Sequence, residues 1–571
     1  MRHLLLLPVL CVAAAAQDVD QNRFVPADST VVVRMAAPAK WKVKFEKTQV
    51  AKLLQAATLA PMLDQIDGGV QGLLAQLRSS GKFDADLVEK YLSDYRGDIV
   101  FAVQFDGAKL AEAMANGEPP QLGMVISFGP DGSFDLGALA AAIEKAIEEN
   151  DDGRVPLRDL QVGDLRLRVS DDEEMQVSVP KLVDGHIVML VGNDLEHQAA
   201  KMLGKEGRRQ SANDDSTLSV HASLGGLVSG FIDMIAFQAD QAGAPFDVAK
   251  VLGDTGLAAL DNIDMRIGAD DRQLVADLEI GLNDKEPGLF GMVMLDQANP
   301  KLLRYLPAGA EHFSALAFDV GAIYRSIQNV WTSLEGVVPM SFGDFETMAT
   351  EELKVRLKED LLDHIGTEMM TISDFQAGLE VAATSDDEDP MAMLAGECIC
   401  VSLRDGKKFG ESLEKAMRAR GLHAARKTEE YQGAKVHRLS LGGLVEAEYC
   451  VTDEMLLLAI GGDEASRRNL RAVLDQRASG EAAELPAKVK PQVELMAKGW
   501  SGLAVTPMAS ILDGLDAVLQ QANALGDAPP EMEMVLEVLH GLGRDMRRLG
   551  LENMVQTTHS TKRMLKSHLR W

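Results

Sequence analysis

The feature that most constrains this chain is an internal repeat. Turns and apolar runs of the first half recur in the same order in the second half, at an offset of about 270 residues. The clearest matching segments are 97–103 with 366–372, 123–128 with 398–403, and 186–194 with 455–463. A repeat of this length is typical of two copies of one folding unit. We therefore expect two homologous units in tandem, at 17–295 and 296–571.

Each copy combines two kinds of hydrophobic pattern. Apolar residues recur at helical spacing over 136–147 and again over 409–417. They alternate with polar residues over 165–169, 175–179 and 445–451, as in strands with one solvated face. Short links between successive strands favour antiparallel pairing, because parallel strands need long crossovers. Each copy is therefore predicted to be α+β, a mostly antiparallel sheet with amphipathic helices packed against it.

Two helix boundaries can be predicted in the second copy. Asp463 ends an apolar run and is expected to cap a helix that begins at Glu464. Residues 337–351 look irregular and partly acidic, so the helix that follows them is expected to begin at Glu352. The chain is expected to finish on a strand at 564–571.

Residues 1–16 have the composition of a secretory signal peptide. Arg2 supplies a positive charge, residues 4–12 form an apolar run, and Ala14 and Ala16 form a small-residue cleavage motif. The apolar run is shorter than the roughly 20 residues that a bilayer-spanning helix requires. We therefore expect export to a periplasmic or extracellular location and no membrane-spanning segment.

Charge restricts the partners of this protein. Acidic residues outnumber basic residues by 87 to 57, which gives a formal charge of -30. Such a surface repels polyanions, which argues against nucleic acid as a partner and favours a monomer. The 27 methionines supply flexible apolar side chains that suit variable hydrophobic surfaces. The expected partner is a protein or a hydrophobic ligand.

Three cysteines remain after the predicted cleavage. Cys398 and Cys400 alternate onto one face of a predicted strand, where they could meet Cys450 on another strand. Three interpretations stay open. The cysteines form one disulfide with a thiol left over, or they are small buried side chains, or they bind a metal together with His437.

Motifs that carry chemistry are scarce. The sequence contains no Gly-x-Ser-x-Gly, no phosphate-binding loop and no His-Glu-x-x-His. The run Asp254-Thr255-Gly256 resembles half of an aspartic-protease site, but it occurs once and is better explained as a turn at a helix end. We therefore predict no catalytic residues, no metal-binding or cofactor-binding residues, and no cofactor.

The start of the chain carries a family resemblance. A Pro-Ala-Asp turn leads into a valine-rich strand, and a Lys-Trp-Lys segment and a Leu-Ala-Pro-Met-Leu helix follow. The residues concerned are Pro26, Asp28, Trp41, Pro61, Gly97 and, in the second copy, Pro307. This pattern resembles exported bacterial proteins of the domain of unknown function 3352 family, many of them from planctomycetes and cyanobacteria. The resemblance implies a signal peptide and duplicated α+β units, and it identifies no functional residue.

These observations predict an exported, non-catalytic protein. We expect it to bind a partner or to form a structural component of the bacterial envelope or periplasm. One alternative is a carrier of a lipid or other hydrophobic ligand, which would need apolar surface that the fold leaves open. A second alternative is a hydrolase whose site is not visible in the sequence, because its residues converge only in three dimensions.

Overall fold

The structure is a computed structural model that describes most of the chain from residue 24 to residue 571. The segments not described are 1–23, 27–28, 57–58, 60–67, 70, 73, 77, 80–84, 106–112, 114–115, 117–121, 132–133, 149–155, 163–164, 171–174, 194, 196–215, 271–272, 298, 379–395, 442–444, 461–462, 497 and 525–530. The predicted signal peptide at 1–16 therefore lies outside the described residues.

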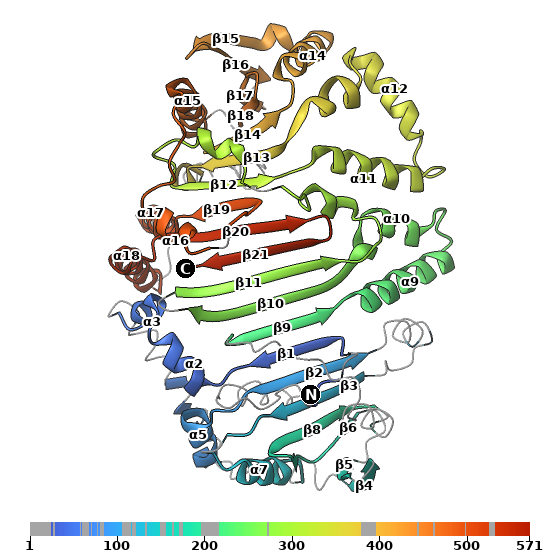
Figure 1. Ribbon diagram of the computed structural model, residues 1–571, viewed down its shortest axis with the longest axis vertical. Coiled ribbons are helices and arrows are strands. Elements are labelled where there is room, and N and C mark those ends of the chain that lie inside the picture. Colours follow the sequence, from blue (N-terminus) through green and yellow to red (C-terminus); the bar gives the residue numbers. More distant parts are fainter. Residues whose placement is uncertain are drawn as a thin grey trace. The chain divides into compact units, whose positions relative to one another are not determined.

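The chain divides into two compact units. Unit 1 comprises Met1–Ala244 and Leu260–Asn283, and unit 2 comprises Pro245–Ala259 and Asp284–Trp571. Each unit contains a large antiparallel sheet with helices packed against it (Figure 1). The predicted α+β class is therefore confirmed.

The main sheet of unit 1 has the strand order β8-β3-β2-β1-β9-β10-β11, and every pair is antiparallel. Its strands are β1 (Val31–Met35), β2 (Ile99–Phe105), β3 (Leu122–Phe128), β8 (His186–Gly192), β9 (Leu218–Ser223), β10 (Leu260–Asp270) and β11 (Gln273–Leu282). Short strands β6 (Gln176–Val177) and β7 (Lys181–Val183) extend it beside β8, and β4 (Leu157–Val162) pairs separately with β5 (Leu165–Ser170). Its helices with described bounds are α2 (Pro38–Phe45), α3 (Gln49–Leu54), α5 (Ala85–Asp94), α7 (Leu136–Glu148) and α9 (Gly225–Gln241).

The sheet of unit 2 has the order β15-β16-β17-β18-β14-β13-β12-β19-β20-β21, again antiparallel throughout. Its strands are β12 (His312–Ala317), β13 (Ile365–Ser373), β14 (Glu397–Leu403), β15 (Arg426–Tyr431), β16 (Ala434–Leu441), β17 (Val445–Val451), β18 (Met455–Ile460), β19 (Gly502–Thr506), β20 (Met554–Thr561) and β21 (Met564–Arg570). The final strand β21 agrees with the strand predicted at 564–571.

The α-helices of unit 2 are α10 (Val248–Asp254), α11 (Val320–Ser333), α12 (Phe342–Leu353), α14 (Gly406–Ala419), α15 (Glu464–Ser479), α16 (Lys490–Glu494), α17 (Met508–Ala524) and α18 (Glu531–Leu549). Single helical turns are η2 (Leu257–Ala259), η3 (Gly288–Met292), η4 (Lys301–Tyr305), η5 (Leu357–Leu361), η6 (Leu362–His364) and η8 (Leu422–Ala425).

The two units share a strand order. The spatial order in unit 1 is β8-β3-β2-β1-β9-β10-β11, and in unit 2 it is β18-β14-β13-β12-β19-β20-β21. Strands at the same place in the two orders also come in the same sequence along the chain, so that β1 corresponds to β12 and β9 to β19. In both units the first of these strands lies in the middle, with the next three strands of the order on one side of it and the last three on the other. This agreement supports an internal duplication, which stays a prediction.

Two tight turns show how local sequence sets strand register. Asp184 and Gly185 join β7 to β8, and Gln432 and Gly433 join β15 to β16. All four residues have positive φ, with values of 50° and 83° in the first turn and 50° and 71° in the second. Two consecutive positive φ values are typical of type I′ hairpin turns, whose twist matches that of the flanking strands.

Helix starts follow capping side chains. Asp463 accepts a hydrogen bond from the backbone N–H of Ser466 at 2.7 Å, and α15 begins at Glu464 as predicted. The prediction for 337–351 was wrong, because α12 already begins at Phe342. Ser341 caps this helix by accepting from the N–H of Asp344 at 3.1 Å. A serine within the sequence Ser341-Phe342-Gly343-Asp344 is a weaker pattern than an aspartate at the end of a strand, and it does not mark the helix start clearly.

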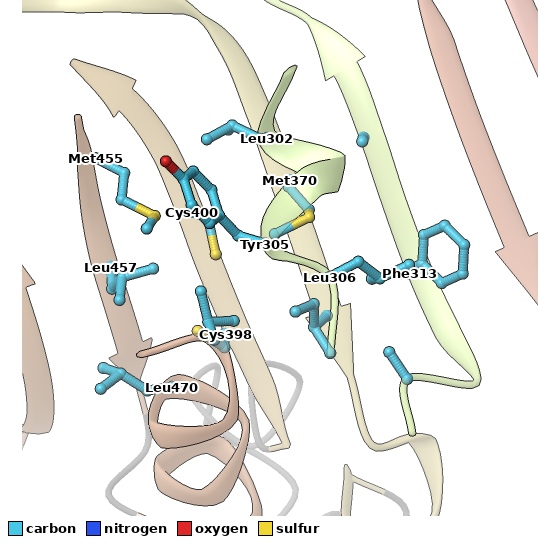
Figure 2. Close-up of a cluster of buried hydrophobic side chains, with 14 of the residues drawn as sticks. Leu302, Tyr305, Leu306, Phe313, Met370, Cys398, Cys400, Met455, Leu457 and Leu470 are labelled. Carbon is cyan, nitrogen blue, oxygen red and sulfur yellow. The ribbon is translucent and has the colours of Figure 1, made fainter. Parts of the chain in front are cut away.

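The core of unit 2 lies on one face of its sheet. Residues directly opposite one another form a buried row across six neighbouring strands, which consists of Cys450, Leu457, Cys400, Met370, Ala315 and Leu503. Leu302, Tyr305 and Leu306 from η4 and the residue after it pack against this face, as does Leu470 from α15 (Figure 2). Burying these side chains supplies the main driving force for folding this unit.

A buried ion pair ties β1 to β2 in unit 1. Arg34 donates two hydrogen bonds to one carboxylate oxygen of Asp98, at 2.9 Å from Nε and 2.6 Å from Nη2. Lys40 in α2 approaches the other oxygen at 3.4 Å. The side chain of Asp98 has no exposed surface. Breaking such a pair leaves a buried charge without its main partner, which is costly.

Replacing Arg34 by alanine is therefore expected to lower the free energy of unfolding by about 3 kcal/mol. Urea denaturation of Arg34→Ala and of the unmodified protein measures the difference. The control is Arg166→Ala, which removes a solvent-exposed pair with Asp159 and should change stability little. Equal losses in the two variants would contradict the assignment of Arg34 as a buried structural anchor.

Candidate functional site

The candidate site is an apolar sheet face in unit 1. It covers one side of β1, β9, β10 and β11, where side chains on neighbouring strands lie directly opposite one another. We define the apolar sheet face as Val31, Val33, Met35, Leu218, Val220, Ala222, Ile263, Met265, Ile267, Leu274, Ala276, Leu278 and Ile280. Twelve of these side chains are half-buried, and Leu278 is 38% exposed. Four adjacent strands make this surface about 14 Å wide.

Helices pack against the same face at the other end of the sheet. There Ile126, Phe128 and Met189 of β3 and β8 are buried beneath α5 and α7. Figure 1 shows α2 and α3 beside one end of β9–β11 and α9 beside the other, and no described helix crosses these strands. The apolar sheet face therefore continues the core of unit 1 into a region where solvent reaches the side chains.

The opposite face of β9, β10 and β11 is polar. Nδ1 of His221 lies 2.6 Å from a carboxylate oxygen of Asp264, and the amide of Asn262 donates to the other oxygen at 2.8 Å. Alternation along the strands thus separates ionisable side chains from the apolar sheet face, which has none. A ligand on the apolar side can be held only by nonpolar contacts with side chains.

The three cysteines lie in the core of unit 2, and all are buried and unpaired. Cys398 and Cys400 point into the buried cluster from β14 (Figure 2). Cys400 and Cys450 both lie opposite Leu457, one on each side of β18. Two strand spacings amount to about 10 Å, whereas a disulfide needs Cα atoms within roughly 7 Å. The predicted meeting of the β14 thiols with Cys450 is therefore excluded for Cys400.

The metal-binding alternative requires His437 to lie on the same face of the sheet as the cysteines. Val436 lies opposite Cys450, so the adjacent His437 projects from the other face of the sheet. His437 packs against Tyr449 instead, with 4.9 Å between the ring centroids. Among the described residues, no group of three or more histidine, cysteine or acidic side chains could hold a metal ion.

The Asp254-Thr255-Gly256 run forms the end of α10, as the turn interpretation predicts. Asp254 accepts a hydrogen bond from Ser333 and lies 3.6 Å from Lys250. Gly256 has a φ of 94°, and a side chain there would collide with the backbone of Pro287. The carboxylate of Asp254 is thus held by neighbouring polar groups at a packed helix end.

No protein-family model matches the chain, and no curated protein matches it. Two solved structures, titled crystal forms III and I of TP0453, are similar over part of the chain. The first is 10% identical and covers 49% of this chain and 88% of its own, with a TM-score of 0.20. The second is 11% identical and covers 47% and 81%, with a TM-score of 0.21. Similarity at this level supports no conclusion about this protein.

Sequence analysis did not identify the apolar sheet face as a site. Its alternating apolar residues over 218–222, 263–267 and 274–280 are visible in the sequence and predict strands. They do not show whether a helix covers those strands. That distinction depends on tertiary packing, and the structure resolves it in favour of partial exposure.

The three cysteines are expected to resist alkylation in the folded protein. Burial raises the pKa of Cys450 to about 11, and a hydrogen bond with Cys398, together with burial, raises the pKa of Cys400. Both thiols stay protonated at pH 8, and the thiolate is the reactive form. Mass spectrometry after iodoacetamide treatment at pH 8 should find none of the three labelled before denaturation and all three labelled after it. Fewer than three labels on the denatured, unreduced chain would indicate a disulfide.

Proposed function

We propose that this protein is an exported, non-catalytic binding protein of the bacterial envelope or periplasm that carries a hydrophobic ligand. The observation that carries the proposal is the apolar sheet face of unit 1. Contiguous apolar surface that stays accessible to solvent is typical of binding sites, because a monomer otherwise buries it. Export remains an inference from the sequence of residues 1–16.

The composition of the apolar sheet face points to one class of ligand. Its residues are all valine, isoleucine, leucine, methionine or alanine, so it offers neither a hydrogen-bonding side chain nor an aromatic ring. A ligand that loses no hydrogen bonds with water on such a surface is aliphatic and uncharged where it makes contact. We assign this surface to an acyl chain, from either a free fatty acid or a lipid. Met265 supplies a flexible side chain that adjusts to acyl chains of different shape.

Among the helices that the structure describes, none combines the length and the apolar character needed to span a bilayer. The resemblance to the domain of unknown function 3352 family is consistent with an exported binding protein, and membership of that family stays part of the proposal.

Native mass spectrometry of the protein purified from its own envelope fraction tests the proposal directly. We expect a chain that begins at Gln17 and carries a stoichiometric excess mass, which extraction with organic solvent identifies as an acyl compound. A bare polypeptide mass would favour the structural role instead. A chain that retains residues 1–16 would contradict export with cleavage.

A charge placed on the apolar sheet face should weaken binding. Leu278→Lys puts an ammonium group where the acyl chain would lie, and we expect the affinity for cis-parinaric acid to fall about tenfold, measured by fluorescence titration. Gln273→Lys is the matched control, because it adds the same charge to β11 on the polar face. Equal effects of the two substitutions, or no effect of Leu278→Lys, would contradict the proposed site.

A further inference from the structure

A pocket of about 390 Å³ lies in unit 2, where the first two turns of α14 meet β15, β16 and β17. Pockets that bind small molecules span about 300–1,000 Å³, so this one is large enough for a small organic molecule. It belongs to the other unit than the apolar sheet face and differs from that face in chemistry. Nothing in the proposed function uses it.

The charge of this pocket is opposite to that of the protein. Its lining contains the basic residues Lys407, Arg426, Lys435 and Arg477 and the acidic residues Glu414 and Asp453. It therefore has an excess of positive charge in a chain whose formal charge is -30. A concave site of one sign concentrates ligands of the opposite sign.

Arg426 is held in place at the wall of the pocket. Its Nη1 donates to Glu414 at 2.5 Å and to the hydroxyl of Tyr449 at 3.1 Å. Hydrogen bonds from Arg426 and Arg418 lower the pKa of Glu414 to about 2, so this carboxylate stays ionised at physiological pH. Both of these hydrogen bonds come from Nη1 of Arg426. Among the described residues, none accepts a hydrogen bond from its Nε or Nη2. Part of the guanidinium fork remains available to a ligand.

The other three basic groups have no ion-pair partner among the residues that the structure describes, although the charge of Arg477 contributes to lowering the pKa of Glu454. Within the described part of unit 2, Lys407, Lys435 and Arg477 form no ion pair, whereas Arg438 and Arg468 on other surfaces pair with Glu446 and Asp374. An ammonium or guanidinium group without a carboxylate partner is available to bind an anion.

Polar and apolar groups complete the pocket. His437 is oriented by a 2.8 Å hydrogen bond between its Nδ1 and the hydroxyl of Thr428. The hydroxyl oxygen of Tyr449 accepts a hydrogen bond from Arg426, so the hydroxyl proton of Tyr449 is free to donate to a ligand. Leu413 and Val451 provide apolar surface beside them. The site can therefore recognise a molecule with an anionic end and a nonpolar part.

We propose that this pocket binds a small organic anion, with a carboxylate or phosphate group between Arg426, Lys435 and Arg477. Arginine binds both groups through paired N–H donors. The nonpolar part of the ligand would rest against Leu413 and Val451.

Isothermal titration calorimetry of the full protein at low salt tests this inference, with succinate and inorganic phosphate as separate probes and choline as a cationic control. We expect saturable binding of at least one anion and none of choline. Stronger binding of succinate would identify the ligand as a carboxylate, and stronger binding of phosphate would identify it as a phosphate ester. Absence of binding by both anions would overturn the proposal.

Substitutions of basic residues test whether the anion binds in this pocket. The variant Lys435→Gln should lower the affinity for the anion about tenfold, since it removes one charge-assisted contact. Lys427→Gln is the matched control on β15, because Lys427 projects from the face opposite Arg426. An equal loss in the control would show that only the general surface charge attracts the anion, and the pocket assignment would fail. A thermal melt of each variant verifies that it is folded.

Discussion

Alternation of side chains along antiparallel strands is the constraint on which the rest of this structure depends. Because the side chains of neighbouring residues point to opposite faces of the sheet, the register of a strand fixes which face each side chain occupies. In unit 2 this alternation produces the buried row that includes Cys400, Leu457 and Met370, which α15 and η4 cover. In unit 1 it separates the apolar sheet face from the polar face that carries His221 and Asp264.

The two proposed sites arise from different uses of the same architecture. The apolar sheet face exists because the described helices of unit 1 cover β3 and β8 and leave β9, β10 and β11 accessible. The pocket of unit 2 that Arg426, Lys435 and Arg477 line exists because the ends of β15, β16 and β17 meet the start of α14. Neither site needs a catalytic group, and their ligands differ in chemistry. An aliphatic chain suits the first and a small anion suits the second.

Much of the fold could be predicted from local sequence. Helices α7, α14 and α15 were anticipated from apolar spacing and from Asp463, because a capped amphipathic helix is encoded within a few turns of chain. Helix α12 was missed because Ser341 is a weak signal on its own. The cysteines were placed on the correct face of β14, but the distance between Cys400 and Cys450 depends on β18, which lies between them.

The amino-acid sequence by itself determined the α+β class, the antiparallel pairing, the strongly acidic charge and the absence of known catalytic motifs. Each of these follows from composition or from patterns only a few residues long. Only the tertiary structure decided which strands are neighbours, which apolar face stays accessible and which basic side chains converge. Arg426, Lys435 and Arg477 line one pocket although up to about 50 residues separate them, and no local pattern encodes such long-range contacts.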